Sequence, residues 1–160
     1  MKKRGFTIVE TTLVIAIAGL IFLLAFVALP ALTRSQRDSQ RKDDVMKLAD
    51  SIKKWQSNNN RGALPDGLNQ LTGVVDKFIG GNFEDPDGGK YVLVYQKCGE
   101  KNCDSANTEI SNAKQTEYKM FFVPGAKCNS NNLAEKTANN RKAVVIYKLE
   151  SGNAAYCFEL

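Results

Sequence analysis

Four cysteines carry the most reactive side chains of this chain, and all lie in its polar second part: Cys98, Cys103, Cys128 and Cys157. Four thiolates can bind zinc, but such sites usually combine two closely spaced pairs, and Cys128 and Cys157 are far apart in the sequence. An even number of cysteines beyond an apolar segment favours disulfides in an oxidising compartment, with three possible connectivities. The short separation in CGEKNC favours a Cys98–Cys103 loop, which leaves Cys128 to pair with Cys157.

A second group of ligand-forming side chains lies in the stretch EDPDGG, which contributes Glu84, Asp85 and Asp87. Their carboxylate oxygens are of the type that binds calcium. Pro86 and Gly88, in contrast, are residues that favour a turn. We therefore expect a turn that leads into a strand, with calcium as the alternative, and we expect no other metal and no cofactor.

Catalytic chemistry is restricted because the chain contains no histidine. This excludes Ser-His-Asp triads, Cys-His dyads and histidine-ligated metals, and we do not expect an enzyme. Lys136, Arg141 and Lys142 form a basic group that could contact nucleic acid, although such groups are usually a solvated surface. Because three of the five net positive charges come from residues 2–4, the rest of the chain is only weakly basic. Nucleic acid is therefore not an expected partner.

One carboxylate, Glu10, lies at the start of a long apolar segment. From Leu13 to Leu32 there are twenty residues without a charge, enough for a helix of about 30 Å, the thickness of the hydrocarbon core of a bilayer. A carboxylate in lipid costs free energy, so Glu10 would gain from a cationic partner. The alternative is that its side chain reaches out to the lipid headgroups.

The apolar segment is expected to continue into an amphipathic helix, because no glycine or proline interrupts the residues from Thr33 to Asn60. Within this second half, apolar residues recur at steps of three and four, which predicts one buried helical stripe. The stripe consists of Val45, Leu48, Ala49, Ile52 and Trp55. Pro30 should kink or loosen the long helix, and Gly19 is a second weak point.

The remainder of the chain predicts a small α+β domain. Asp66 could cap a short second helix that ends at Gly80-Gly81. Segments rich in Val, Ile, Tyr and Phe then predict strands at residues 90–96, 117–123, 142–149 and 154–160. The Asn-rich residues 124–141 predict a long surface loop. We expect an antiparallel sheet of three or four strands, packed on the second half of the long helix.

The first residues resemble a known processing signal. KKRGFTIVE at residues 2–10, followed by the apolar segment, resembles the N-terminus of type IV prepilins and pseudopilins. The resemblance implies that a prepilin peptidase cuts between Gly5 and Phe6 and methylates the new amino group of Phe6. It also implies that Glu10 pairs with the Phe6 amine of a neighbouring subunit, and that the subunits assemble into a helical filament. The turn at residues 85–91 (DPDGGKY) is similar to a turn of the same family.

This resemblance implies a pilin-like fold in three parts: a leader at residues 1–5, a transmembrane and filament-core helix at 6–33, and a globular domain at 34–160. The partners would be further copies of the chain, the prepilin peptidase and an inner-membrane assembly platform. Before assembly the chain would span the cell membrane once with its N-terminus in the cytoplasm, and after assembly it would lie in an extracellular pilus. The family often has its helix-breaking proline a few residues before Pro30, where this chain has Val27. Gly19 stands where a helix-loosening glycine is common.

Two alternatives remain open. The chain could be a pseudopilin of a type II secretion or competence system, or a single-pass membrane-anchored binding protein that does not polymerise. A cleaved secretory signal is disfavoured, because a cut after Ala28 or Ala31 would place Phe26 or Leu29 where a small residue is needed.

The charges around the apolar segment do not favour the expected orientation, since five basic residues follow it: Arg34, Arg37, Arg41, Lys42 and Lys47.

Overall fold

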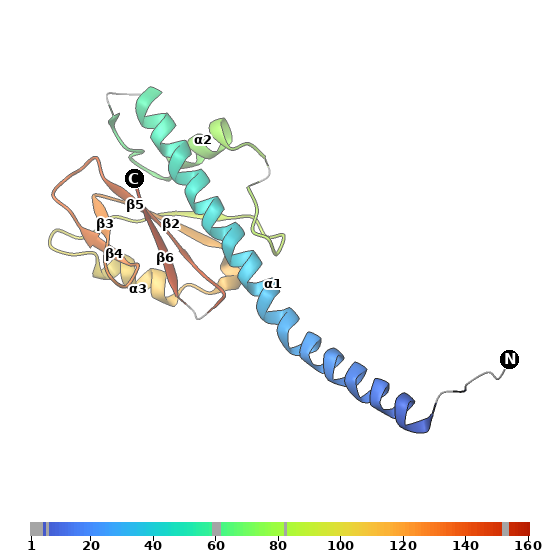
Figure 1. Cartoon of the computed structure of the whole chain (residues 1–160). Coiled ribbons are helices and arrows are strands. Elements are labelled where there is room, and N and C mark those ends of the chain that lie inside the picture. Colours follow the sequence, from blue (N-terminus) through green and yellow to red (C-terminus); the bar gives the residue numbers. More distant parts are fainter. Residues whose placement is uncertain (1–4, 6, 59–61, 82, 152–153) are drawn as a thin grey trace. The chain divides into compact units, whose positions relative to one another are not determined.

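The computed structural model describes residues 5, 7–58, 62–81, 83–151 and 154–160. The chain divides into two compact units, residues 1–36 and residues 37–160. A single long helix, α1 (Ile8–Asn58), contributes its first part to one unit and its second part to the other (Figure 1). The predicted continuation of the apolar helix into an amphipathic one is thus confirmed.

Among the described residues, the second unit combines the end of α1 with two further helices, a 3-10 helix and six strands. These are α2 (Leu68–Phe78), β1 (Val92–Tyr95), α3 (Asp104–Asn112), the short 3-10 helix η2 (Gln115–Glu117), β2 (Lys119–Pro124), β3 (Ala126–Cys128), β4 (Ala134–Lys136), β5 (Ala143–Lys148) and β6 (Ala155–Glu159). The predicted second helix and all four predicted strands are present. Helix α3 and the hairpin β3–β4 were not predicted, and the hairpin lies within the expected loop of residues 124–141.

The main sheet has four strands in the order β1-β2-β5-β6. β5 is antiparallel to both β2 and β6, but β1 is parallel to β2. The expectation of an all-antiparallel sheet was therefore wrong. A parallel pair needs a long crossover connection, and the segment that contains α3 and η2 supplies it. Gly152-Asn153 between β5 and β6 is a sequence that predicts a tight hairpin turn, and both residues lie outside the described residues.

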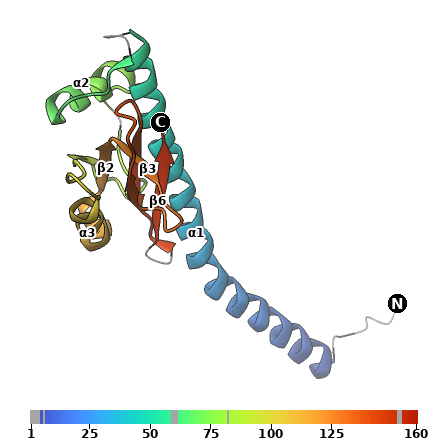
Figure 2. The same ribbon diagram turned by 90° about the vertical axis from the view of Figure 1, so that its left-hand side faces the viewer.

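The sheet is covered on both faces, because its two sets of alternating side chains enter separate apolar clusters. On one face, Met120, Phe122 and Val145 pack with the second half of α1 and with α2. On the other face, Phe121 and Ile146 pack with α3 and with the β3–β4 hairpin. Figure 2 shows the end of α1 and α3 on opposite sides of the sheet. Burial on both faces explains the continuous apolar runs of β2 and β5.

The predicted stripe of α1 is confirmed as the helix face that packs on the sheet. Val45, Leu48, Ala49 and Ile52 are fully buried, and Trp55 packs against the same cluster. The predicted cap of α2 was wrong. Gly67 is the N-cap residue, and the Asp66 N–H donates a hydrogen bond to the Gln70 side chain at 3.0 Å. The reason is that Gln70 lies one turn into the helix and caps the preceding backbone itself.

Candidate functional site

The predicted processing site precedes α1. Gly5 is exposed and lies outside the helix, and a side chain at its position would meet no atom within 4 Å. Phe6, the residue expected to follow the cut and to be methylated, lies outside the described residues. An exposed, non-helical backbone is the conformation in which a peptide bond is open to a protease.

Glu10 forms a capping box with Thr7 at the start of α1. The Thr7 N–H and hydroxyl both donate hydrogen bonds to Glu10 Oε2, at 2.9 and 3.0 Å. The Glu10 N–H donates in return to the Thr7 hydroxyl at 3.3 Å. Sequence reasoning missed this role, although Thr-Ile-Val-Glu matches the pattern of such a box. Because Gln also serves in a capping box, this local role does not require a negative charge.

The apolar part of α1 is exposed on all sides. Among the described residues from Ile8 to Leu32, the large aliphatic and aromatic side chains are between 52% and 82% exposed. This helix is long and apolar enough to cross a membrane. A helix that is apolar on every face must be covered by lipid or by other protein. The first unit therefore presents a surface that is not stable in contact with water alone.

The two expected weak points of this segment are both helical in the structure. α1 continues through Gly19 and through Pro30. After the proline, the Thr33 hydroxyl donates to the carbonyls of Leu29 and Pro30, at 3.2 and 3.0 Å. Whether Gly19 and Pro30 loosen the helix on assembly stays a prediction.

Arg41 is a buried residue at the centre of a group of charges in the second unit. Its guanidinium is 1% exposed, and each of its five N–H groups donates to a carboxylate. The distances are 2.8 and 2.9 Å to the two oxygens of Asp85, 3.1 Å to Asp38, 2.7 Å to Asp87 and 3.2 Å to Glu150. Arg37 adds ion pairs to Asp87 and Glu150, each at 2.7 Å. We call these six residues the Arg41 cluster.

The cluster connects segments that are distant in sequence. Asp38 and Arg41 come from α1, Asp85 and Asp87 from the turn before β1, and Glu150 follows β5. Sequence reasoning missed the cluster, but a signal existed, because positions 38 and 41 continue the buried stripe by helical steps from Val45. A charged residue in an apolar stripe predicts a buried partner.

Hydrogen bonds, rather than exposure, set the charge state of the two buried carboxylates. Burial would raise the pKa of Asp85, but hydrogen bonds from Arg41, the Asp87 N–H and the Tyr147 hydroxyl outweigh it and lower the pKa. Burial would likewise raise the pKa of Asp38, and bonds from Ser151, from the Glu150 N–H and from Arg41 lower it. Both groups are thus held ionised beside Arg41.

Two buried tyrosines donate hydrogen bonds to carboxylates, one within this cluster and one beside it. The Tyr147 hydroxyl donates to Asp85 at 2.9 Å, and the Tyr91 hydroxyl donates to Asp44 at 3.0 Å. Burial, and then the adjacent carboxylates, raise the pKa of both hydroxyl groups. The two rings meet edge to face with centroids 5.6 Å apart.

The predicted turn before β1 is present, and its carboxylates face arginines. The Asp85 N–H donates to the Gly89 carbonyl, and the Gly88 N–H donates to the Asp85 carbonyl, both at 2.7 Å. Glu84 is exposed, and its backbone forms an isolated antiparallel β-bridge with Lys90. Asp85 and Asp87, the other calcium candidates, bind Arg41 and Arg37. Within the described residues, acidic and cysteine side chains form no group that could hold a metal ion.

Both predicted disulfides are present. Cys98–Cys103 closes the short loop between β1 and α3. Cys128–Cys157 joins the β3–β4 hairpin to the edge strand β6, and the Cys128 N–H also donates to Glu159 at 2.7 Å. The hairpin is thereby linked covalently to the sheet, whereas the other disulfide lies within the crossover between β1 and β2.

The structure separates Lys142 from the other two basic candidates for nucleic-acid contact. Lys136 and Arg141 line a pocket at one end of the sheet. Lys142 instead lies near Glu159, with 3.9 Å between the charged atoms.

Comparison with known proteins does not assign the chain to a family. No protein-family model, no curated protein and no solved structure matches it.

Proposed function

We propose that this chain is a structural subunit of a type IV pilus, cut by a prepilin peptidase and assembled into a helical surface filament. The observation that carries the proposal is the apolar part of α1, which is exposed on every face and belongs to a different unit from the sheet domain. A bilayer covers such a helix before assembly, and neighbouring copies cover it in a filament core. The prepilin-like residues 2–10 precede it directly.

The cysteine chemistry supports an extracytoplasmic domain. Two disulfides in a domain of this size are typical of oxidising compartments. The basic residues after the apolar segment argue against this orientation, because the positive-inside rule counts Lys and Arg and gives little weight to nearby carboxylates. We give the two disulfides more weight.

The processing step is tested by mass spectrometry of the purified protein before and after reduction. A mature chain that starts at an N-methylated Phe6 and contains two disulfides is the expected result. A chain that retains Met1 in cells with an active prepilin peptidase would contradict the proposal.

The assembly role of Glu10 can be separated from its capping role with three variants. Glu10→Gln keeps a capping acceptor but removes the charge. Thr7→Val removes the hydroxyl half of the capping box but keeps the charge, and Glu10→Val removes the charge together with the carboxylate half of the box. If charge pairing with the amine of Phe6 drives assembly, Thr7→Val cells make filaments, whereas both Glu10 variants are cut, stay in the membrane and make few. Normal piliation of Glu10→Gln cells would show that pairing is not needed. If only the Thr7→Val cells fail to make filaments, assembly depends on the cap.

A pseudopilin shares all of these features, and the position of the β3–β4 hairpin favours the pilin. The hairpin is tied to the edge of the sheet by Cys128–Cys157, as expected for a segment reinforced for exposure outside the cell. Deletion of the gene distinguishes the two functions: loss of surface fibres supports a pilin, and loss of secretion or DNA uptake with fibres intact supports a pseudopilin. A membrane-anchored binding protein would be neither cut nor assembled.

A further inference from the structure

Residues 37–44 of α1 are attached to the second unit by polar contacts. The boundary between the two compact units lies directly before this segment, so it is the place where α1 joins its domain. Its sequence, RDSQRKDD, contains no apolar residue, and its buried side chains are those of Asp38, Arg41 and Asp44. The buried apolar side chains of α1 begin only at Val45. The first two turns of α1 in the domain therefore depend on charges and hydrogen bonds for their attachment.

The Arg41 cluster attaches this segment to two loops at the same end of the sheet. β1 starts and β5 ends there, because β1 runs parallel to β2 and β5 runs antiparallel to it. The Arg41 guanidinium binds Asp85, before β1, at 2.8 and 2.9 Å, and Glu150, after β5, at 3.2 Å. Asp38 accepts hydrogen bonds from the N–H groups of Glu150 and Ser151, at 2.9 and 2.8 Å. The segment cannot move away from either loop without breaking these bonds.

Contacts outside the cluster add less to this attachment. Asp44 accepts one hydrogen bond from the Tyr91 hydroxyl at 3.0 Å. The Lys42 ammonium lies 5.5 Å from the centroid of the Tyr156 ring. Each of these is a single contact, whereas Arg41 donates five hydrogen bonds to four carboxylates. Arg41 is thus the residue on which the attachment of the segment depends most.

Release of residues 37–44 would expose charges to water rather than apolar side chains of the helix. The hydration that these charges regain offsets much of the attraction that they lose, because a buried ion pair gains little over its solvated groups. Apolar side chains receive no such compensation when they enter water. Regions with few buried apolar contacts are also the regions that open locally in folded proteins. The segment therefore has the properties of a part of α1 that can open separately from the rest of the domain.

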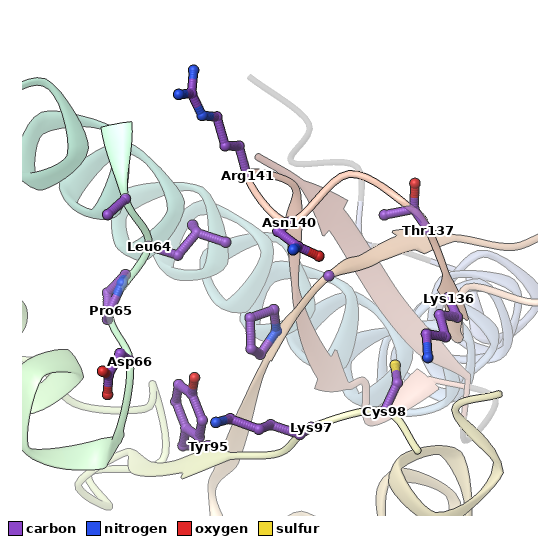
Figure 3. A pocket seen from close by; sticks show the side chains of 13 residues that line it. Leu64, Pro65, Asp66, Tyr95, Lys97, Cys98, Lys136, Thr137, Asn140 and Arg141 are labelled. Atoms are coloured by element: carbon purple, nitrogen blue, oxygen red, sulfur yellow. The ribbon is translucent and has the colours of Figure 1, made fainter. Parts of the chain in front are cut away.

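The later turns of α1 are held differently. The stripe from Val45 to Ile52 is buried in the apolar core. At the other end of the sheet, where β1 and β2 finish, the Gln56 side chain lies 3.5 Å from the Arg141 carbonyl. Figure 3 shows the Arg141 guanidinium at this end pointing away from the Lys97 ammonium, so these two charges do not meet at one centre. Charges thus hold α1 where it enters the domain, and apolar packing holds it further along.

We propose that residues 37–44 form a latch, a part of α1 that opens and closes on the domain as one unit and is kept closed by the Arg41 cluster. When the latch is closed, α1 leaves the domain at Arg37. When the latch is open, α1 leaves the domain at Val45, so that about 12 Å more of the helix is free. The stripe that begins at Val45 and the sheet stay packed in both states. The proposal concerns the second unit alone and does not depend on whether the chain polymerises.

The test is hydrogen–deuterium exchange of the full-length protein in detergent micelles, read by peptic digestion and mass spectrometry. It compares the amides of residues 38–44 with those of β2 and β5. In Arg41→Met, the amides of the latch should exchange at least ~10-fold faster than in the unchanged protein, because a buried carboxylate loses its cation. The amides of β2 and β5 should stay at least ~10³-fold slower than those of an unfolded chain, because the domain remains folded.

Two further variants make this comparison specific. Lys54→Met is the matched control, because it removes one positive charge from an exposed position of α1 beyond the latch, and exchange at residues 38–44 should then change by less than about twofold. Arg41→Lys keeps a cation beside Asp85 but offers fewer donors, which cannot reach both loops. It should leave the domain folded while the latch exchanges several-fold faster, and it decides the question if Arg41→Met does not fold.

Two results would overturn the proposal. One is unchanged exchange at residues 38–44 in both Arg41 variants, which would show that the segment stays in place without the cluster. The other is an equal loss of protection in the latch and in β2 and β5 of Arg41→Lys. That result would show that the segment opens only when the whole domain unfolds.

Discussion

Replacement of Arg41 by methionine tests whether the Arg41 cluster determines how the second half of α1 is held on its domain. Methionine keeps most of the apolar stem of the side chain but removes all five N–H donors. Asp85 has a side chain that is 0% exposed and would lose both of its bonds to the guanidinium. Asp38, with a side chain 4% exposed, would lose one. The variant thus leaves a buried carboxylate without a cation.

The expected cost follows from this geometry. Removal of one partner from a buried ion pair typically destabilises a protein by ~3–5 kcal/mol. For a domain of this size, 1 kcal/mol lowers Tm by about 4 °C, so Arg41→Met should lower the Tm of the sheet domain by roughly 10–20 °C. Circular dichroism of the full-length protein in detergent micelles measures this shift.

Lys47→Met is the matched control, since it removes one positive charge from the same helix. The Lys47 side chain is 63% exposed, and its ion pair among the described residues is with Asp44 in the i,i+3 position; such surface pairs contribute about 0–1 kcal/mol. The double variant Arg41→Met/Asp85→Asn should recover part of the loss, because it also removes the unpaired charge. If Arg41→Met lowers Tm by no more than Lys47→Met does, the cluster is not a determinant of stability.

Three further predictions concern the same domain. The pKa values of Asp38 and Asp85 are lowered in the folded state, so the two ionised carboxylates stabilise the fold above the unfolded pKa of about 4. This stabilisation is lost as the pH falls through the folded pKa values. The Tm should therefore drop below about pH 4, and Asp85→Asn should reduce this drop. Replacement of Cys128 and Cys157 by alanine should lower the free energy of unfolding by about 3.5 kcal/mol, and replacement of Cys98 and Cys103 by about 2 kcal/mol, because the first pair closes the longer loop. Denaturant unfolding measures both losses, and the reverse order would contradict this reasoning. Gly89→Ala should destabilise the domain by ~1–3 kcal/mol, since the new Cβ would lie 2.1 Å from a ring atom of Tyr118. Gly73→Ala lies in open space on α2 and should be neutral or stabilising by up to ~1 kcal/mol. Thermal unfolding measures both variants.

Local patterns predicted most of the elements, because their signal lies in nearby residues. The buried stripe of α1 follows from the spacing of apolar residues, and the strands follow from β-branched and aromatic runs. The disulfides were predictable for the same reason, since the short Cys98–Cys103 separation leaves only one pairing for the other two cysteines. Each of these features depends on contacts or restrictions that the sequence itself displays.

Features that depend on distant contacts were not predicted. The parallel pairing of β1 with β2 requires the crossover through α3, whose buried side chains Ala106 and Ile110 form too short an apolar stripe to be distinguished from a polar loop. The Arg41 cluster unites α1 with residues 44 and 109 positions further along the chain. No local pattern shows which carboxylate will face an arginine, so Asp85 and Asp87 were considered as calcium ligands instead.

Arg41 and Glu10 show how burial and hydrogen bonding separate a charge that serves its own fold from one that remains available to a partner. Arg41 is buried and uses every N–H group on carboxylates of the same domain, so no donor of this guanidinium is left for another molecule. Glu10 is exposed, and both hydrogen bonds that it accepts from Thr7 use Oε2; among the described residues, none is donated to Oε1. In lipid or in a filament core, this free oxygen cannot be satisfied by water. A cation brought by a second copy would satisfy it without breaking the capping box, and the comparison of Glu10→Gln with Thr7→Val therefore distinguishes an intermolecular contact from a purely local one.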